Sequence, residues 1–569
     1  MKPFIYIFFL LNGFTLFAQD DWDNNTEGEL EDSQIVIEKN RSLDLPRASR
    51  NFLKVPTTDR SQDSIRLRSD WNEITPGLGK LKPKLRVLRI KSEPLPKLFA
   101  NQVSAGLGNY GATFLSGFVG NKRDRNKSYG VQFYHKNFNR GAVDKKYSGS
   151  GYQMIRPWAR FFNDKFSVET SLHYDRINNF AYGLEEETLN FNETFERSEF
   201  RKTFQTIGAD VVLADRKIED KLNYNYQIGF HHLFGNADDS ETLLNFKLNN
   251  YYNLENNLAA SLLIEGFASN YKNQNTELTI NRSLLQFKPR ISYEMGDLLF
   301  HGGLTISADN NKQAENRLYF LPDFAASYFP LANTFIKAQL RGEVQAVTAR
   351  ELVEVNPYLD PLSKLSNSVK PIELKLSAGT NLFKKIQAEA SFSLASIKNV
   401  TFFENFRLPF QEGSNYFNSS TFIVDEHIAA FNGIVFLQSD FGSFFNMQLK
   451  GEYFRYADGD IDNFPNIPEL SINVLSSFNI KDKLEIGLNI YAQSAMDAFL
   501  AVRQGTNDTE PDIVEIDAFA DLGLSTRYNL TSRASIFLNA NNLLANNYQF
   551  YLNYPNRGFQ VIAGFTYSF

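Results

Sequence analysis

The last segment of the chain, residues 559–569, constrains the fold more than any other stretch. Large apolar side chains occupy most of its odd positions, and small or polar side chains occupy most of its even positions. A period of two indicates a β-strand, and this contrast indicates two faces with different surroundings. An exposed apolar row would promote edge-to-edge pairing in a soluble sheet. The segment therefore favours a closed barrel in a bilayer, with a buried strand of a β-sandwich as the alternative. The odd positions are Phe559, Val561, Ala563, Phe565, Tyr567 and Phe569.

The same alternation recurs in many segments between residue 98 and residue 569. In each segment an apolar row alternates with a row that includes charged or amide side chains, so the second face is expected to contact water. The apolar rows are therefore predicted to face lipid. They include Tyr129, Val131 and Phe133; Leu244, Phe246 and Leu248; Ile372, Leu374 and Leu376; Ile386, Ala388, Ala390, Phe392 and Leu394; Phe445, Met447 and Leu449; and Leu484, Ile486, Leu488 and Ile490.

Connections of two lengths separate these segments. Short turns at one end and long loops at the other are typical of outer-membrane barrels, with the long loops extracellular. The predicted fold is all-β: a transmembrane, antiparallel, up-and-down β-barrel of about 22 strands, each with about 10 residues in the membrane. Tight turns are expected at 163–164, 255–257, 295–296, 439–440 and 481–482, and longer loops near 139–150, 178–198, 349–368, 400–419, 497–512 and 547–556.

Composition excludes several classes of protein. The 569 residues contain no cysteine, which excludes disulfides, thiol catalysis, thiolate metal sites and a lipid-anchored cysteine. The formal net charge of −6 argues against a nucleic-acid partner. The 52 Phe and 26 Tyr residues are a heavy aromatic content for a mean hydropathy of −0.34. A transmembrane barrel reconciles these values, because half of each strand faces a polar lumen.

Two regions are expected ahead of the barrel. Residues 1–18 resemble a secretory signal peptide, because Lys2 precedes an apolar core and Ala18 provides a cleavage site. A membrane anchor is the alternative, but the apolar run is short for a membrane span. Residues 19–97 change from acidic to basic and contain several prolines, so a periplasmic extension is expected there. The barrel is assigned to residues 98–569.

Short stretches at both ends of the expected barrel resemble TonB-dependent outer-membrane transporters. Asn541–Leu544, Tyr554-Pro555, Arg557-Gly558 and Phe565–Phe569 are similar to the closing hairpin of that family, and Gly108–Ala112 to its first hairpin. The resemblance implies a 22-stranded barrel and uptake of a nutrient across the outer membrane. Members of the family carry a plug domain longer than residues 19–97. The chain therefore looks like a transporter barrel that has lost its plug or replaced it with a shorter insert.

Two further segments predict partners. One is similar to the short box that pairs with TonB. The other is the apolar final strand, which is the free edge until the barrel closes and is expected to be read by the barrel-assembly machinery. Other envelope proteins and outer-membrane lipid are the remaining expected partners. The box-like residues are Gln34, Ile35, Val36 and Ile37, and the assembly-signal residues are Phe565, Tyr567 and Phe569.

No catalytic residue and no cofactor is expected. The sequence contains no nucleophile elbow, phosphate loop or zinc motif, so an enzyme is not expected. Asp458, Asp460 and Asp462 alternate in a loop and are a candidate Ca²⁺ site, with a solvated turn as the alternative. The six histidines show no metal-ligand spacing, and lumen or interface positions are expected for them. They are His135, His173, His231, His232, His301 and His427.

Three functions remain open. The first is a nutrient-uptake protein of the TonB-dependent-receptor type, and the second is a plugless barrel that serves as a structural or assembly subunit of an envelope complex. The third, a passive porin, is disfavoured because an open lumen of about 22 strands would leak small molecules. Residues 80–97 and the loops at 178–198, 349–368 and 400–419 are expected to occlude the lumen. An acidic lumen is expected from inward Glu265, Glu373, Glu389, Glu452 and Glu485.

Overall fold

The computed structural model describes residues 99–569, except for 123, 142–147, 182–199, 217–220, 256, 312–316, 361, 363, 384, 411–413, 458–463, 505–506 and 509–510. The expected signal peptide, the amino-terminal extension, the box-like residues 34–37 and the Ca²⁺ candidates Asp458, Asp460 and Asp462 lie outside these ranges. Those expectations therefore stay predictions. Among the described residues, no helix is long and apolar enough to cross a membrane.

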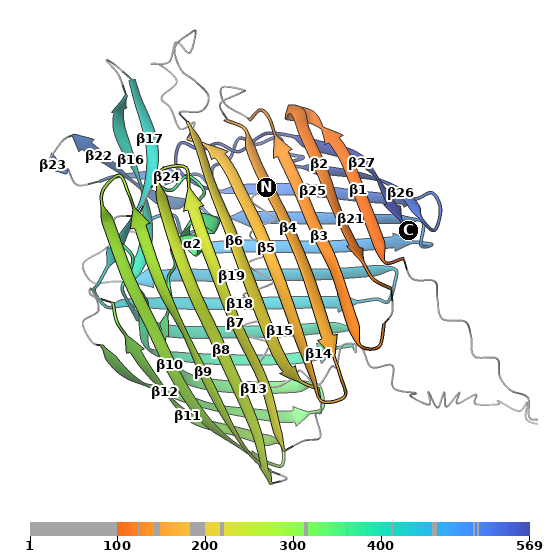
Figure 1. Cartoon of the computed structure of the whole chain (residues 1–569), viewed down its shortest axis with the longest axis vertical. Coiled ribbons are helices and arrows are strands. Elements are labelled where there is room, and N and C mark those ends of the chain that lie inside the picture. Colours follow the sequence, from red (N-terminus) through yellow and green to blue (C-terminus); the bar gives the residue numbers. More distant parts are fainter. Residues whose placement is uncertain are drawn as a thin grey trace, which may run out of the picture. The chain divides into compact units, whose positions relative to one another are not determined.

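A closed antiparallel sheet of 22 strands forms the barrel (Figure 1). Successive barrel strands pair with each other, and the first strand pairs with the last. The predicted fold class and strand number are therefore confirmed. The barrel strands are β1 (Asn101–Gly108), β2 (Ala112–Gly120), β3 (Lys127–Phe138), β4 (Ser150–Phe162), β5 (Phe166–Phe180), β6 (Arg201–Asp215), β7 (Leu222–Gly235), β8 (Asp239–Glu255), β9 (Leu258–Asn273), β10 (Leu278–Met295), β11 (Leu298–Asp309), β12 (Leu318–Leu331), β13 (Thr334–Gln345), β14 (Ser368–Leu382), β15 (Ile386–Lys398), β18 (Ile428–Asp440), β19 (Phe445–Ala457), β20 (Leu470–Ile480), β21 (Leu484–Gln493), β25 (Phe519–Asn529), β26 (Ala534–Asn541) and β27 (Gln560–Ser568).

Backbone hydrogen bonds between β1 and β27 close the barrel. The N–H of Phe569 donates to the carbonyl of Asn101 at 2.9 Å, and the N–H of Asn101 donates to the carbonyl of Phe569 at 3.3 Å. Phe565 and Tyr567 lie on the same closing strand. The residues expected to signal assembly thus form the seam of the barrel, and their recognition by the assembly machinery stays a prediction.

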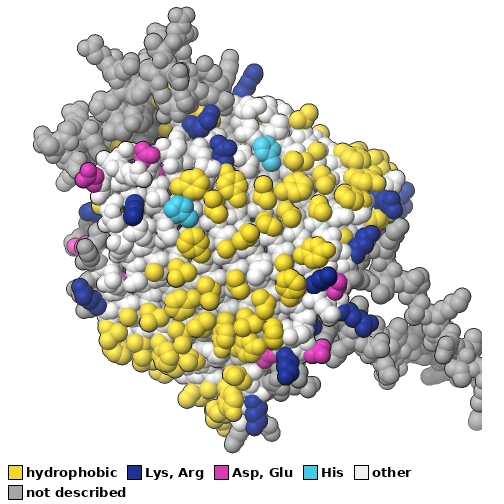
Figure 2. Space-filling view, viewed as in Figure 1, with side chains coloured by type: hydrophobic (Ala, Val, Ile, Leu, Met, Phe, Trp, Pro, Cys, Tyr) yellow, Lys and Arg dark blue, Asp and Glu magenta, His cyan; other side chains and the backbone are white. Residues whose placement is uncertain are grey.

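Apolar rows lie on the outer face of the barrel. Phe565 and Tyr567 are 46% and 41% exposed, whereas Thr566 between them is 2% exposed. On β19, Leu449 alternates with Lys450 and Glu452, whose side chains pair with each other on the other face. Figure 2 shows apolar side chains spread across the outer wall, with charged side chains mostly near its margins. Members of the predicted rows that are exposed include Tyr129, Val131, Leu244, Ile372, Leu374, Leu376, Phe392, Leu394 and Ile490.

Tight turns join the strands at one end of the barrel, where the sequence predicts them. The turns predicted at 163–164, 255–257, 295–296 and 481–482 fall at the connections of β4 to β5, β8 to β9, β10 to β11 and β20 to β21. The turn predicted at 439–440 is placed too early, because Ser439 and Asp440 end β18 and residues 441–444 connect it to β19. At the opposite end the long connections predicted near 400–419 and 497–512 do lie between barrel strands, but they are not irregular loops. The chain there forms a second sheet, in which the pairing of the strands satisfies their backbone groups. Its strands are β16 (Val400–Phe410), β17 (Ser414–Val424), β22 (Met496–Gln504), β23 (Asn507–Asp508) and β24 (Asp512–Ile516).

Candidate functional site in the barrel lumen

Ion pairs line much of the inner wall. Four of the five glutamates expected to face inward have a basic partner on the wall, so the expectation of an acidic lumen is wrong at these positions. The reason is that opposite charges occupy nearby positions on the same face of the sheet. The pairs are Glu265–Lys288 (2.5 Å), Glu373–Arg341 (3.0 Å), Glu452–Lys450 (2.7 Å) and Glu485–Arg527 (3.5 Å). Glu389 instead accepts a hydrogen bond from Gln387 at 2.7 Å.

Residues 346–367 lie between β13 and β14, and we call this segment the lumen cap. Its described residues, all but 361 and 363, fold against the inner wall. It contains the helix α2 (Ala349–Val355). The helix begins with a reciprocal capping box, in which the Thr348 hydroxyl accepts from the N–H of Glu351 at 3.2 Å and the Glu351 carboxylate accepts from the N–H of Thr348 at 3.0 Å. Apolar side chains of the cap pack on wall residues of β6, β7 and β9. The buried cluster comprises Ala349, Leu352, Val353, Leu359, Leu362 and Leu365 of the cap with Phe204, Leu233 and Tyr271 of the wall.

Buried polar groups of the wall hold both ends of the lumen cap. The Arg282 side chain is 1% exposed, and its guanidinium donates to the carbonyl of Val347 at 2.6 Å and to Oδ1 of Asn367 at 3.0 Å. The carboxylate of Glu241 accepts from the N–H of Arg350 at 3.1 Å. On β10, Arg282 alternates with outward residues such as Leu285, which is 49% exposed. The cap therefore lies on the lumen side, and the expected inward folding of 349–368 is confirmed.

Two other segments pack on the lumen cap. The ring of Tyr554 stacks on that of Tyr358 with centroids 3.8 Å apart, and the Tyr551 hydroxyl donates to the carbonyl of Val355 at 2.6 Å. The β16–β17 hairpin joins the same layer, because the Asn356 amide donates to the Ser419 hydroxyl at 2.7 Å. Three connections from the loop end of the barrel therefore interlock. The loop at 178–198 was expected to help occlude the lumen. Most of it lies outside the described residues, so that expectation stays a prediction.

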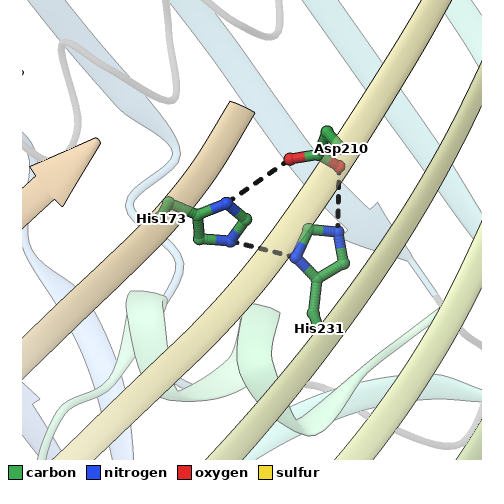
Figure 3. Close-up of side chains that lie close together, drawn as sticks. All are labelled: His173, Asp210 and His231. Carbon is green, nitrogen blue, oxygen red and sulfur yellow. Dashed lines mark hydrogen bonds and ion pairs between the residues drawn. The ribbon is translucent and has the colours of Figure 1, made fainter. Parts of the chain in front are cut away.

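A cluster of two histidines and one aspartate lies on the wall formed by β5, β6 and β7 (Figure 3). Nε2 of His173 is 3.0 Å from Nδ1 of His231. The two carboxylate oxygens of Asp210 lie 3.4 Å from the remaining nitrogens, Nδ1 of His173 and Nε2 of His231. The histidine side chains are 4% and 7% exposed, whereas that of Asp210 is 37% exposed. The cluster is therefore embedded in the wall and open toward the lumen through its carboxylate.

Strand pairing explains why these side chains meet. Gly208 on β6 lies between His173 and His231 in the register, and Asp210 follows two positions later on the same face. A Cβ atom at Gly208 would lie 2.2 Å from Nε2 of His173 and 2.6 Å from Nδ1 of His231. A glycine at this position therefore leaves the space in which the two rings meet.

The expectation that no histidine binds a metal stays a prediction. The structure nevertheless brings His173 and His231 together with Asp210, in a group that could hold a metal ion. Their separation of 58 residues hides a contact that only the pairing of β5, β6 and β7 creates. A glycine on the lumen-facing side of a strand, such as Gly208, is the sequence feature that could have indicated that polar side chains of the neighbouring strands meet there. The expectation that His231 and His232 point to opposite faces agrees with their partners, because Nδ1 of His232 contacts the Thr242 hydroxyl at 2.9 Å instead.

Several receptors and transporters of known structure share this fold. The FrpB iron transporter from Neisseria meningitidis matches with a TM-score of 0.61 and 11% identity, over 84% of this chain and 82% of that chain. The siderophore receptor PirA from Acinetobacter baumannii gives 0.59 and 12%, over 82% and 80%. The ferric-catecholate import receptor Fiu from Escherichia coli K12 gives 0.58 and 9%, over 83% and 82%. No protein-family model and no curated protein sequence matches the chain. The chain therefore has the barrel fold of the TonB-dependent receptors that its sequence resembles.

Proposed function

We propose that this protein resides in the outer membrane and takes up a nutrient in the manner of TonB-dependent receptors. The observation that carries the proposal is a wet lumen that the lumen cap partly fills from the loop end. A passive porin needs a permanently open path, whereas a receptor needs a pathway that opens only after its ligand binds. Three similar structures are named as an iron transporter, a siderophore receptor and a ferric-catecholate receptor, which favours a metal complex as the nutrient.

The amino-terminal region would connect this barrel to the periplasm. In the proposal, residues 1–18 direct export, residues 19–97 remain on the periplasmic side, and residues 34–37 pair with TonB. The basic partners of the wall glutamates weaken the electrostatic reason for residues 80–97 to enter the lumen. The proposal therefore assigns closure of the loop end to the lumen cap rather than to the extension.

The alternative function is a structural or assembly subunit of an outer-membrane complex. It is favoured by a cap held through buried polar contacts, which would suit a permanent closure. The two functions differ in one respect: a receptor needs the cap to move, and a structural subunit does not.

Uptake measurements in cells separate the two functions. Cells that lack the protein would be complemented with the full chain, with a chain lacking residues 34–37, or with a chain whose lumen cap is tethered to the wall by a disulfide between introduced cysteines. The cysteine-free background makes such a tether selective. The accumulation of ferric siderophores and other labelled metal complexes would then be measured.

Uptake that is restored by the full chain, and lost in the tethered chain until a reductant is added, is expected for a receptor. Loss of uptake without residues 34–37 would further support coupling to TonB. Equal accumulation with and without the protein, together with its recovery in a stoichiometric envelope complex, would contradict the proposal and support the structural role.

A further inference from the structure

His173, His231 and Asp210 do not carry enough hydrogen atoms to make a hydrogen bond at each of their mutual contacts. Three contacts join His173, His231 and Asp210, and each needs one hydrogen or one cation between its two atoms. Two neutral imidazoles supply only two N–H groups, and an ionised carboxylate supplies none. If His231 donates from Nδ1 to His173, and His173 donates from Nδ1 to Asp210, the contact between Nε2 of His231 and Oδ1 of Asp210 is left with lone pairs on both atoms.

A third lone pair points toward the gap between Nε2 of His231 and Oδ1 of Asp210. Oδ1 of Asn245, on β8, is buried and has no hydrogen-bond partner among the described residues. The space above Gly229 on β7 is where these atoms converge. A Cβ atom at Gly229 would lie 2.6 Å from Oδ1 of Asn245, 2.6 Å from Oδ1 of Asp210 and 2.9 Å from Nε2 of His231. One imidazole nitrogen, one carboxylate oxygen and one amide oxygen therefore surround a position that no side chain occupies.

We propose that this position binds a single divalent transition-metal ion through Nε2 of His231, Oδ1 of Asp210 and Oδ1 of Asn245. An imidazole together with oxygen ligands suits Zn²⁺ and its first-row neighbours, and the absence of thiolates removes the preference for Cu(I). The remaining coordination positions face the lumen, through which the ion and its water ligands enter beside the part-exposed Asp210. The inference goes beyond nutrient uptake and does not depend on it.

His173 is a positioning residue in this site. Its Nε2 accepts from Nδ1 of His231, which fixes the tautomer that turns the lone pair of Nε2 toward the ion. Its Nδ1 donates to the other carboxylate oxygen of Asp210, at 3.4 Å, and so orients that ligand as well. Hydrogen bonds of this kind outside the ligand set change metal affinity by about 10–100-fold.

The test is metal binding by the full chain, folded in detergent and stripped with a chelator. Zn²⁺ would be titrated calorimetrically in two buffers of different ionisation enthalpy, and Co²⁺ would be titrated by visible absorption. The expected result is one ion per chain, with a ligand-field spectrum of a low-coordinate Co²⁺ site. His231→Ala and Gly229→Ala should abolish this site, the first by removing a ligand and the second by filling the space.

Further variants separate a built site from adventitious binding. His173→Ala should weaken Zn²⁺ about 10–100-fold while the Co²⁺ spectrum persists at saturation. His232→Ala is the matched control, since the neighbouring ring contacts Thr242 on the outer face and should bind as wild type does. Folding of each variant is checked by its heat-modifiable migration, and Asp210→Asn replaces Gly229→Ala if the latter fails to fold.

Two results would overturn the proposal. If the stripped wild-type chain binds no Zn²⁺ or Co²⁺ at neutral pH, a proton lies between Nε2 of His231 and Oδ1 of Asp210. The two histidines and Asp210 then form an ion pair and not a metal site. If binding persists in both His231→Ala and Asp210→Asn, the ion sits elsewhere. Neither result would change the outcome of the uptake measurements, so the two proposals fail independently.

Discussion

Replacing Arg282 with methionine should release the lumen cap from the wall. The guanidinium donates one hydrogen bond to the carbonyl of Val347 at one end of the cap and one to the amide oxygen of Asn367 at the other. It also lies 3.9 Å from the carboxylate of Glu241, whose side chain is 0% exposed. Methionine retains much of the buried apolar volume but none of these interactions, so the change removes polar contacts with little loss of packing.

The expected loss of cap docking is about 3–5 kcal/mol. Each hydrogen bond from a charged donor contributes about 1.5–3 kcal/mol, and the change removes two of them. Removing one member of a buried ion pair costs about 3–5 kcal/mol, because the other charge stays buried. Glu241 keeps two donors, the Ser269 hydroxyl and the N–H of Arg350, which limits the loss to that range. At about 1.4 kcal/mol per factor of ten, the open population of the cap rises by a factor of about 10² to about 4 × 10³.

Limited trypsin digestion of the folded protein in detergent measures that population. Cleavage within the cap, after Arg350 or Lys364, requires local opening, so its rate follows the opening equilibrium when closing is fast. The matched control is Arg290→Met, on the same strand and the same face. Arg290 pairs with Asp323 at 3.0 Å on the wall below the cap. Cap cleavage that is equally fast in wild type and Arg282→Met, or equally accelerated in Arg290→Met, would refute the anchoring role.

Three further predictions concern the membrane wall, assembly and pH. Leu449→Arg on the outer face should destabilise the folded barrel by about 2–4 kcal/mol, whereas Gln448→Arg on the lumen face should cost little in a urea titration. Deleting Tyr567–Phe569 should leave export intact but sharply reduce the heat-modifiable barrel in outer-membrane fractions, and normal levels would contradict the assembly signal. Burial raises the pKa of Glu354 above its ordinary value of 4.5, and the pair with Arg350 opposes this only partly. Burial also raises the pKa of Glu351 on the same helix. Because both folded-state pKa values are raised, the cap should be most stable below pH 4.5 and loosen as pH rises through them, so single-channel conductance should rise with pH, and less steeply in Glu354→Gln.

Strand number, strand phase and most turn positions followed from the sequence. Each strand faces lipid on one side and the aqueous lumen on the other. Its apolar and polar side chains therefore alternate, and a short segment of sequence shows this without knowledge of any other strand. Leu449 and Gln448 are placed on their faces by this rule alone. The closing strand was recognisable for the same reason, because Phe565, Tyr567 and Phe569 form a row that needs lipid on one side.

Local sequence patterns do not predict the features that depend on strand pairing. The charge of Glu265 by itself predicts an acidic wall, but Lys288 lies beside it. The segment 400–419 lacks a regular lipid-facing row and so predicts a loop, whereas it pairs as β16 and β17. In both cases the deciding partner is another stretch of chain, whose position depends on the register of the sheet.

The barrel fold can be read from the amino-acid sequence, because the contrast between lipid and water imposes a period of two on every strand. What fills and lines the lumen depends on tertiary contacts. Arg282 donates to Asn367, and the rings of His173 and His231 meet over Gly208, because of the order and stagger of the strands. Such contacts arise from residues that are tens of positions apart, and no local periodicity records them.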